Sequence, residues 1–494
     1  MENNQYSFHT FMFPFQWKIN DLNEDLFSEQ IKLKNINYAP SNYWERVPIP
    51  KTDEEKEGMY NERNYFYQFV HNALYDDGSD DSFIRHFERK IPSSNLAIYK
   101  IDSKNGCYEL EIASIILNLY STGVGVLQFH LKNTKYKELN DIISINEYGR
   151  RIFPPFYDSI NKRDVIAQSI ELVGVPSSTL LKEDFNGYTV NDSNKPASFI
   201  VELIHEVASN ISIEAVVDDR MFVATWYKNT EWVNTLCKQT NDKSEPWSDN
   251  KNWYRFIFID SAASGDPSCQ NEQMLQDLLK QATYKRWQNW DSLYGVSRYS
   301  LVYLTSDGCP DFLTYNFETE YIRIAEHILV QKASVLRFSA EVSRISTLPN
   351  DRLLTSKVDS LYKEYIRFVN QIHFREVSAQ DQGIEMYNMM YETMRIEHQV
   401  EKLEDEIEDL YHYVSLLEDK RTNKTMYWLT LIATIFVPAT VLTAIFGMNN
   451  TYNVVNNNNY FLNIFAIQII AIIVSIVIFI IAFKIYNSKR WRTK

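Results

Sequence analysis

The sequence predicts a chain of two parts, an α+β domain followed by a long stalk helix that continues into a two-helix transmembrane hairpin. Two runs without a charged residue, at 426–448 and 460–483, predict the hairpin. As a helix, each run would extend for about 35 Å, which is enough to cross a hydrocarbon core of about 30 Å. The chain as a whole is rich in aromatic residues and poor in Gly and Pro, which is typical of folded proteins and not of disordered ones.

Residues 1–316 are predicted to form an α/β domain, which is a candidate ligand sensor. The runs 115–120 and 124–129, joined by Ser121-Thr122-Gly123, predict a β-hairpin. The net charge of −14 argues against a nucleic-acid-binding surface, so no DNA or RNA partner is expected. Further strands are predicted at 96–100, 107–112, 211–217, 222–226, 253–259 and 299–304.

From residue 317 the pattern becomes helical. Residues 317–378 are predicted to form a helical segment, with one helix over 318–342 and a second over 351–375. The sequence Thr347-Leu348-Pro349-Asn350 separates the two helices, because Pro cannot continue the first one.

Residues 379–425 are predicted to form the stalk, as one helix without a breaker between Gly383 and Pro438. Apolar residues in this segment follow alternating gaps of three and four, which is a heptad pattern. Two interpretations stay open: the helix packs on its own domain, or it is a long stalk that joins a cytosolic body to a membrane helix. The seam consists of Ile396, Val400, Leu403, Ile407, Leu410, Val414 and Leu417.

The charges that flank the hairpin predict its orientation. Basic residues precede the first transmembrane helix (426–448) and crowd the tail (484–494), whereas the loop between the two helices (449–459) has no charge. Positively charged flanks stay on the cytoplasmic side, so both termini are expected in the cytoplasm and the loop outside. The second helix spans 460–483.

The end of the first apolar run carries the tripeptide Gly447-Met448-Asn449. In this position, after a stalk and before a second span, it resembles the signature of CorA-type divalent-cation channels. The resemblance is close over roughly residues 380–494 and architectural over the first 300. It implies a homopentamer in the inner membrane of a prokaryotic cell, with five first helices lining one pore, and it implies Mg²⁺ or another divalent cation as the transported ion.

The resemblance also implies which residues form the pore. A ring of Asn449 amides, supported by Gly447 and Met448, would hold the hydrated ion, because Mg²⁺ releases its water reluctantly. Acidic residues on the stalk, Glu404, Asp405, Glu408 and Asp409, are candidates for regulatory metal sites. The pore-lining positions would be Asn423, Met426, Leu429, Ala433, Val437, Thr440 and Ala444.

Three segments of the α/β domain suggest ligand recognition instead of a purely structural role. Arg150 and Arg151 could bind phosphate, because each guanidinium can donate two parallel hydrogen bonds. Asp218, Asp219 and Arg220 form a polar cluster at the end of a predicted strand, and the aromatic segment 9–17 could stack a base. For each segment the alternative is a solvated or core-packing role.

The domain is larger than in typical CorA proteins, and the external loop lacks an acidic residue that would attract cations. Both features resemble CorA-like proteins encoded beside type III CRISPR systems. We therefore expect a channel opened by a nucleotide second messenger, such as an adenine nucleotide, as an effector of antiviral defence. A constitutive Mg²⁺/Co²⁺ transporter gated by internal Mg²⁺ is the alternative, and a non-conducting membrane-anchored sensor is the third possibility. No catalytic motif is present, so an enzyme is not expected.

Overall fold

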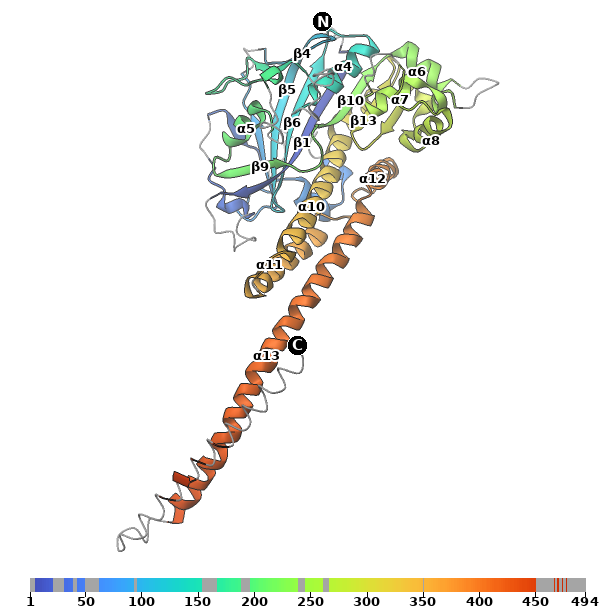
Figure 1. Ribbon diagram of the computed structural model, residues 1–494. Coiled ribbons are helices and arrows are strands. Elements are labelled where there is room, and N and C mark those ends of the chain that lie inside the picture. The colour runs from blue at the N-terminus through green and yellow to red at the C-terminus, as the bar shows by residue number, and fades with distance from the viewer. Residues whose placement is uncertain are drawn as a thin grey trace. The chain divides into compact units, whose positions relative to one another are not determined.

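A computed structural model covers residues 1–494 (Figure 1). The chain divides into two units, Met1–Glu408 and Asp409–Lys494. The structure describes residues 5–20, 31–38, 42–48, 62–92, 96–152, 167–187, 196–238, 245–260, 266–349 and 351–449, with five single positions between 466 and 477.

The first unit is built on a mixed 13-stranded sheet in which β1 (Ser7–Ile19) is central. β1 pairs antiparallel with β10 on one side and with β6 on the other, whereas β10 and β13 run parallel. The remaining sheet order is β11-β12-β13-β10 beyond one edge of β1 and β6-β5-β4-β7-β8 beyond the other. The other strands are β2 (Trp44–Arg46), β3 (Ile84–Arg89), β4 (Ile98–Ser103), β5 (Gly106–Tyr120), β6 (Val124–Asn133), β7 (Ser169–Val173), β8 (Lys182–Asp184), β9 (Ile211–Ala215), β10 (Phe222–Lys228), β11 (Thr283–Tyr284), β12 (Leu293–Val296) and β13 (Ser300–Thr305).

The predicted hairpin is confirmed, because β5 and β6 pair antiparallel across the turn 121–123. Gly123 has a φ of +74°, a left-handed conformation that costs glycine little, which explains its place in this turn. The two predicted runs at 107–112 and 115–120 form one strand, β5, with a register shift between Ile112 and Ser114.

The expectation that residues 9–17 stack a base is wrong, because these residues lie inside β1 and both of its faces are covered. His9 contacts Asn146 on α4 (Leu139–Gly149), and the next residue, Thr10, points to the opposite face, where it contacts His130. On that face α10 (Ile322–Ser346) packs on β1 and β6. A strand that is buried on both faces has a nearly continuous apolar sequence, which explains why this segment is rich in aromatic residues.

The strand predicted at 253–259 is also wrong, since this segment forms the helix α7 (Lys251–Phe258). The Asn250 side chain caps the helix by accepting a hydrogen bond from the Trp253 backbone N–H at 2.9 Å. Trp253, Phe256 and Ile257 then share one buried face, which packs against strands β12 and β13. The other helices of this part are α3 (His71–Leu74), α5 (Ser198–His205), α6 (Thr230–Cys237), α8 (Glu272–Ala282) and α9 (Asp311–Asn316), with 3-10 turns at Leu33–Asn35, Gln68–Val70, Phe185–Gly187, Pro246–Asp249 and Gln288–Trp290.

Long helices follow the sheet, as predicted. A π-helical turn (Phe317–Tyr321) leads into α10, and α11 (Asp351–Gln371) begins after the predicted break and packs on α10. The stalk prediction requires a correction: the helix is interrupted at Arg395, which separates α12 (Asp381–Met394) from α13 (Ile396–Asn449).

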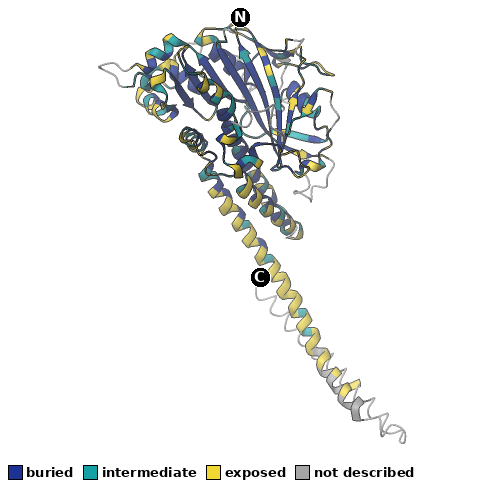
Figure 2. Cartoon of the chain, turned by 180° about the vertical axis from the view of Figure 1, so that it is seen from behind, coloured by how far each residue is buried: buried dark blue, intermediate teal, exposed yellow. Residues whose placement is uncertain are grey.

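The heptad seam is largely buried within the single chain. Ile396, Val400, Leu403 and Ile407 are at most 5% exposed, and they belong to the first unit. This burial supports the interpretation in which the start of the helix packs on its own domain, while the same helix continues to Asn449. Figure 2 shows the change from buried to exposed residues along α13.

Within the part of the chain that the structure describes, no helix combines the length and apolarity needed to cross a membrane. Of the two predicted spans, 426–448 lies within α13. The loop 449–459 beyond Asn449, most of the span 460–483 and the tail 484–494 lie outside the described residues.

Candidate functional site

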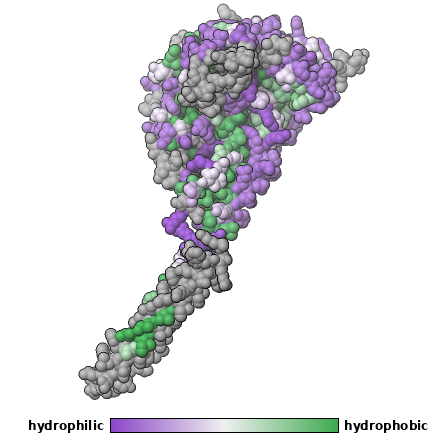
Figure 3. Space-filling model, in the orientation of Figure 1, coloured by the Kyte–Doolittle hydropathy of each residue, from purple (hydrophilic) through white to green (hydrophobic). Residues whose placement is uncertain are grey.

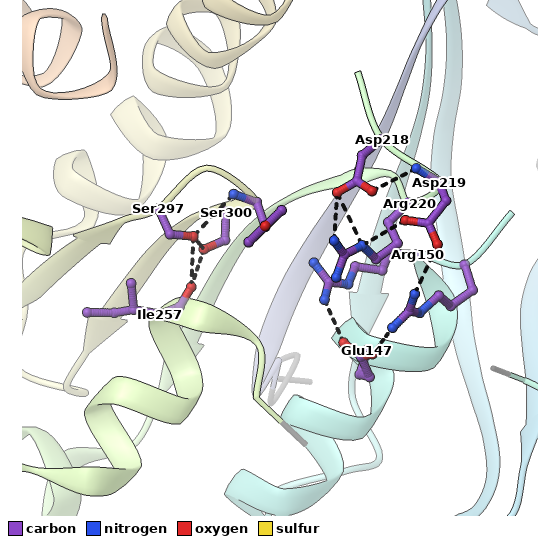
Figure 4. A network of polar contacts seen from close by, with 10 residues as sticks. Glu147, Arg150, Asp218, Asp219, Arg220, Ile257, Ser297 and Ser300 are labelled. Carbon is purple, nitrogen blue, oxygen red and sulfur yellow. Dashed lines mark hydrogen bonds and ion pairs between the residues drawn. The ribbon is translucent and has the colours of Figure 1, made fainter. Parts of the chain in front are cut away.

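The structure brings the predicted ligand-site residues together in one polar cluster (Figure 4). Arg150 follows α4 directly as its C-terminal cap, and Arg151 forms an antiparallel bridge with Arg220. The Met221 N–H also donates to the Arg150 carbonyl at 2.8 Å, so the end of α4 is joined to the segment that leads into β10. We call Glu147, Arg150, Arg151, Asp218, Asp219 and Arg220 the arginine cluster.

Glu147 is the member of the cluster that was not predicted from the sequence. Its carboxylate accepts hydrogen bonds from Arg150 Nη2 at 2.6 Å and from Arg151 Nη2 at 2.5 Å. Residues three and four positions apart share one face of a helix, so the spacing of Glu147 before the two arginines was the available signal. Both arginines and the glutamate are at most 5% exposed, which places the pair in the interior and not on an open surface.

The remaining members form a second set of ion pairs. Arg220 donates to Asp218 at 2.9 Å and lies 3.1 Å from an Asp219 oxygen, while Arg151 Nη1 reaches Asp219 at 3.4 Å. The Arg220 guanidinium also lies over the Tyr299 ring, 4.6 Å from its centroid. The cluster therefore holds three guanidinium groups against three carboxylates. Glu147, Arg150 and Arg151 are buried, whereas the side chains of Asp218, Asp219 and Arg220 are partly exposed.

Titration of the two aspartates differs because their surroundings differ. Burial and the neighbouring Asp218 raise the pKa of Asp219 to about 6. Burial acts in the same direction on Asp218, but hydrogen bonds from Asp219 and Arg220 outweigh it and lower the pKa of Asp218. Of these two aspartates, Asp219 is therefore the one that is protonated first as the pH falls.

Some hydrogen-bond donors in the cluster lack an acceptor. Among the described residues, Arg150 Nε and Nη1 and Arg151 Nε have no hydrogen-bond acceptor, although all three atoms are buried. An unsatisfied buried donor is costly, so these atoms favour an additional acceptor. Phosphate oxygens are suitable acceptors for paired guanidinium groups.

A neutral hydrogen-bond network fixes the helix that carries the cluster. Asn146 Oδ1 lies 2.7 Å from His9 Nδ1 and accepts a hydrogen bond from Thr225 Oγ1 at 3.0 Å. Burial lowers the pKa of His9 to about 4, so the imidazole stays neutral. Tyr99 OH donates to the Gly149 carbonyl at 2.9 Å. These contacts tie α4 to β1, β4 and β10, so the arginines are positioned by the sheet.

The predicted pore positions lie on α13, and their side chains are exposed in the single chain. The exposed fraction is 58% for Met426, 69% for Leu429 and 56% for Val437, and Asn423, Ala433, Thr440 and Ala444 are also exposed. Figure 3 shows apolar surface on the described part of this helix. Gly447, Met448 and Asn449 form the last turn of α13, and the structure describes their backbone but not their side chains.

The predicted regulatory acids, Glu404, Asp405, Glu408 and Asp409, are exposed on α13. Among the described residues, no group of three or more His, Cys, Asp or Glu side chains is arranged to hold a metal ion.

Comparison with known proteins gives one positive result. Residues 328–485 match the family described as CorA-like Mg²⁺ transporter protein. No curated protein matches the chain. The match begins inside α10, includes α11, α12 and α13, and leaves the sheet outside. An α+β domain followed by long helices agrees with the CorA layout, and the match suggests divalent-cation transport. Residues 328–485 are therefore similar to the CorA-like Mg²⁺ transporter family, and a large α+β domain precedes them in the chain.

Proposed function

We propose that this protein is a membrane channel for divalent cations, formed by several copies of the chain and opened when a nucleotide second messenger binds the α+β domain. The observation that carries the proposal is the arginine cluster, in which Arg150 and Arg151 supply buried, phosphate-compatible donors in a domain outside the CorA-like match. The protein acts by conduction, not by catalysis.

Support for conduction comes from α13. Its exposed apolar side chains need a partner or a lipid environment, because a long exposed apolar helix is unstable in water. One two-helix hairpin cannot enclose a pore, so we propose a homo-oligomer, a pentamer by resemblance to the family. The Asn449 ring at the end of α13 would hold the hydrated ion through neutral amide oxygens, and neutral ligands also let it leave.

Support for ligand gating comes from the balance of charges in the arginine cluster. A phosphate group would offer acceptors to Arg150 Nε and Nη1 and would compete with Glu147 for the two guanidinium groups. The end of α4 is joined to the start of β10, so a change of partner at Arg150 would strain the centre of the sheet. The proposed physiological role is that of an effector of prokaryotic antiviral defence, of the type III CRISPR kind. The large domain and the uncharged segment 450–459 support that role.

Ion flux into proteoliposomes tests the proposal, with and without adenine nucleotides. We expect flux only with the nucleotide, and we expect Arg150→Ala combined with Arg151→Ala to abolish both nucleotide binding and flux. Glu147→Gln is the informative second variant, because it removes the competing charge but keeps the side-chain shape. It should tighten nucleotide binding if phosphate replaces Glu147, and weaken it if the cluster only holds the fold together.

Flux that needs no nucleotide and survives the double substitution would instead favour the constitutive Mg²⁺/Co²⁺ transporter. The exposed acids on α13 are the observation that supports this second candidate, and internal Mg²⁺ should then close the channel. Asn449→Ala separates both channels from a non-conducting sensor. It should change ion selectivity in either channel, whereas Asn457→Ala in the neighbouring segment should leave selectivity unchanged. An unaltered ion preference in Asn449→Ala would contradict the role of Asn449.

A further inference from the structure

Helix α12 is separated from α13 at Arg395, where the sequence contains no helix-breaking residue. Arg395 adopts the left-handed conformation, with φ of 54° and ψ of 43°, where a residue with a Cβ is strained. No Gly or Pro lies between Gly383 and Pro438, so the local sequence favours a continuous helix through this point. Strained conformations of this kind persist only where the surrounding structure imposes them.

A lysine on α10 supplies that constraint. Lys332 Nζ donates to the carbonyl of Met394, the last residue of α12, at 3.3 Å. The same ammonium group donates to Oε1 of Gln399, in the first turn of α13, at 2.5 Å. One side chain from a third helix therefore holds both sides of the joint.

A second contact crosses the joint directly. Tyr391 OH, on α12, donates to the Glu397 carboxylate on α13 at 2.5 Å, and His373 Nε2 lies 2.7 Å from the same hydroxyl. Met394 and Ile396, the residues on either side of Arg395, are 4% and 0% exposed. The bent arrangement is thus fixed by polar contacts and by burial of the residues at the bend.

The helix that carries Lys332 is also bonded to the sheet. Glu326 accepts a hydrogen bond from Tyr120 OH at 2.8 Å, at the end of β5. About two and three turns further along α10, Ser334 and Arg337 bond to Thr122 in the β5–β6 turn, at 3.1 Å and 2.8 Å. A movement of the β5–β6 hairpin would therefore move Lys332 relative to the joint.

We infer that Arg395 is a hinge with two states, a bent joint held by Lys332 and a continuous helix from α12 into α13, and that α10 couples the sheet to this choice. A two-state element needs two arrangements that are each favoured by different interactions. Here the local sequence favours the continuous helix, whereas the contacts of Lys332 favour the bend. Burial and the nearby Arg298 also lower the pKa of Lys332 to about 8. A further link from this hinge to ion flux rests on the proposed function, but the hinge itself does not.

Spin labels at Asn388 and Lys402, both exposed and on either side of the joint, measure the two states in the full-length protein. Dilution with unlabelled chain removes distances between copies. A continuous helix separates these positions by about 21 Å along its axis, and the bend shortens that separation. Lys332→Met should increase the population at the longer distance, whereas Arg395→Gly should favour the bend by roughly fivefold to thirtyfold, because glycine removes the left-handed strain.

Lys363→Met, an exposed lysine on α11, is the matched control and should leave the distances unchanged. If Lys332→Met does not fold, Gln399→Leu removes only the contact on the α13 side and should shift the distances in the same direction. Distances in both variants that match the unsubstituted protein would overturn the hinge. Shifted distances without any effect on nucleotide-dependent flux would refute the proposed gating and leave the hinge standing.

Discussion

Replacing Glu147 by alanine should destabilise the fold strongly, because it leaves two buried guanidinium groups without their shared carboxylate. The Arg150 and Arg151 side chains are only 2% and 6% exposed. Arg151 retains Asp219 at 3.4 Å, but Arg150 loses the carboxylate to which it donates. Removing one partner of a buried ion pair costs about 3–5 kcal/mol, so the free energy of unfolding should fall by about that amount.

Urea-induced unfolding of the full-length protein in detergent, followed by tryptophan fluorescence without nucleotide, measures this loss. A pH of 8 keeps Asp219 ionised, because its pKa is about 6. Glu109→Ala is the matched control: Glu109 pairs with Lys135 at 2.7 Å, but the two side chains are 40% and 54% exposed. An exposed pair contributes about 0.2–1 kcal/mol. Equal losses in the two variants would refute the reasoning that burial makes the arginine cluster sensitive.

Two further predictions concern packing and pH. A Cβ at Gly125 would overlap the buried Phe15 ring, so Gly125→Ala should cost about 1–3 kcal/mol of unfolding free energy. Gly308→Ala, whose Cβ would meet its nearest atom at 3.8 Å, should change stability little, and equal thermal shifts would contradict the clash. Burial raises the pKa of Glu320 to about 7 from its usual 4.5, so its contribution to stability is present below pH 4.5 and lost as the pH rises through about 7. Glu320→Gln should flatten the pH dependence of the unfolding midpoint in that window, and an unchanged slope would show that other groups determine it.

The helical part of the fold could be predicted from the sequence because its signals are local. Apolar spacing predicts α10 and α11, and Pro349 explains the break between them. The bend at Arg395 could not be predicted in this way, because Lys332, more than sixty positions earlier, imposes it through space. The aromatic run at 253–259 was ambiguous for a similar reason. Asn250 is a capping signal, but only packing against the sheet decides in favour of a helix.

For the arginine cluster, the sequence indicated most of the residues but not their contacts or their burial. Arg150 and Arg151 were recognisable as a pair, and the spacing of Glu147 made it a local partner. The contact of Arg151 with Asp219 depends on the bridge between Arg151 and Arg220, which joins segments far apart in the chain. Burial of the pair is likewise a property of the assembled sheet.

The central position of β1 in the sheet also affects how the protein is made. Ser7 pairs with Asn133 on β6 and with Tyr227 on β10, so the strand meets its two neighbours only after long stretches of chain have followed it. At about 5–20 residues per second, the ribosome needs roughly 10 to 45 seconds between β1 and β10. Until β6 is made, this aromatic strand has two unpaired edges, and the edge that later pairs with β10 stays unpaired for the whole interval. Chaperone protection of nascent chains should therefore matter most for this segment, and its loss should cause aggregation before the helices of the CorA-like domain are synthesised.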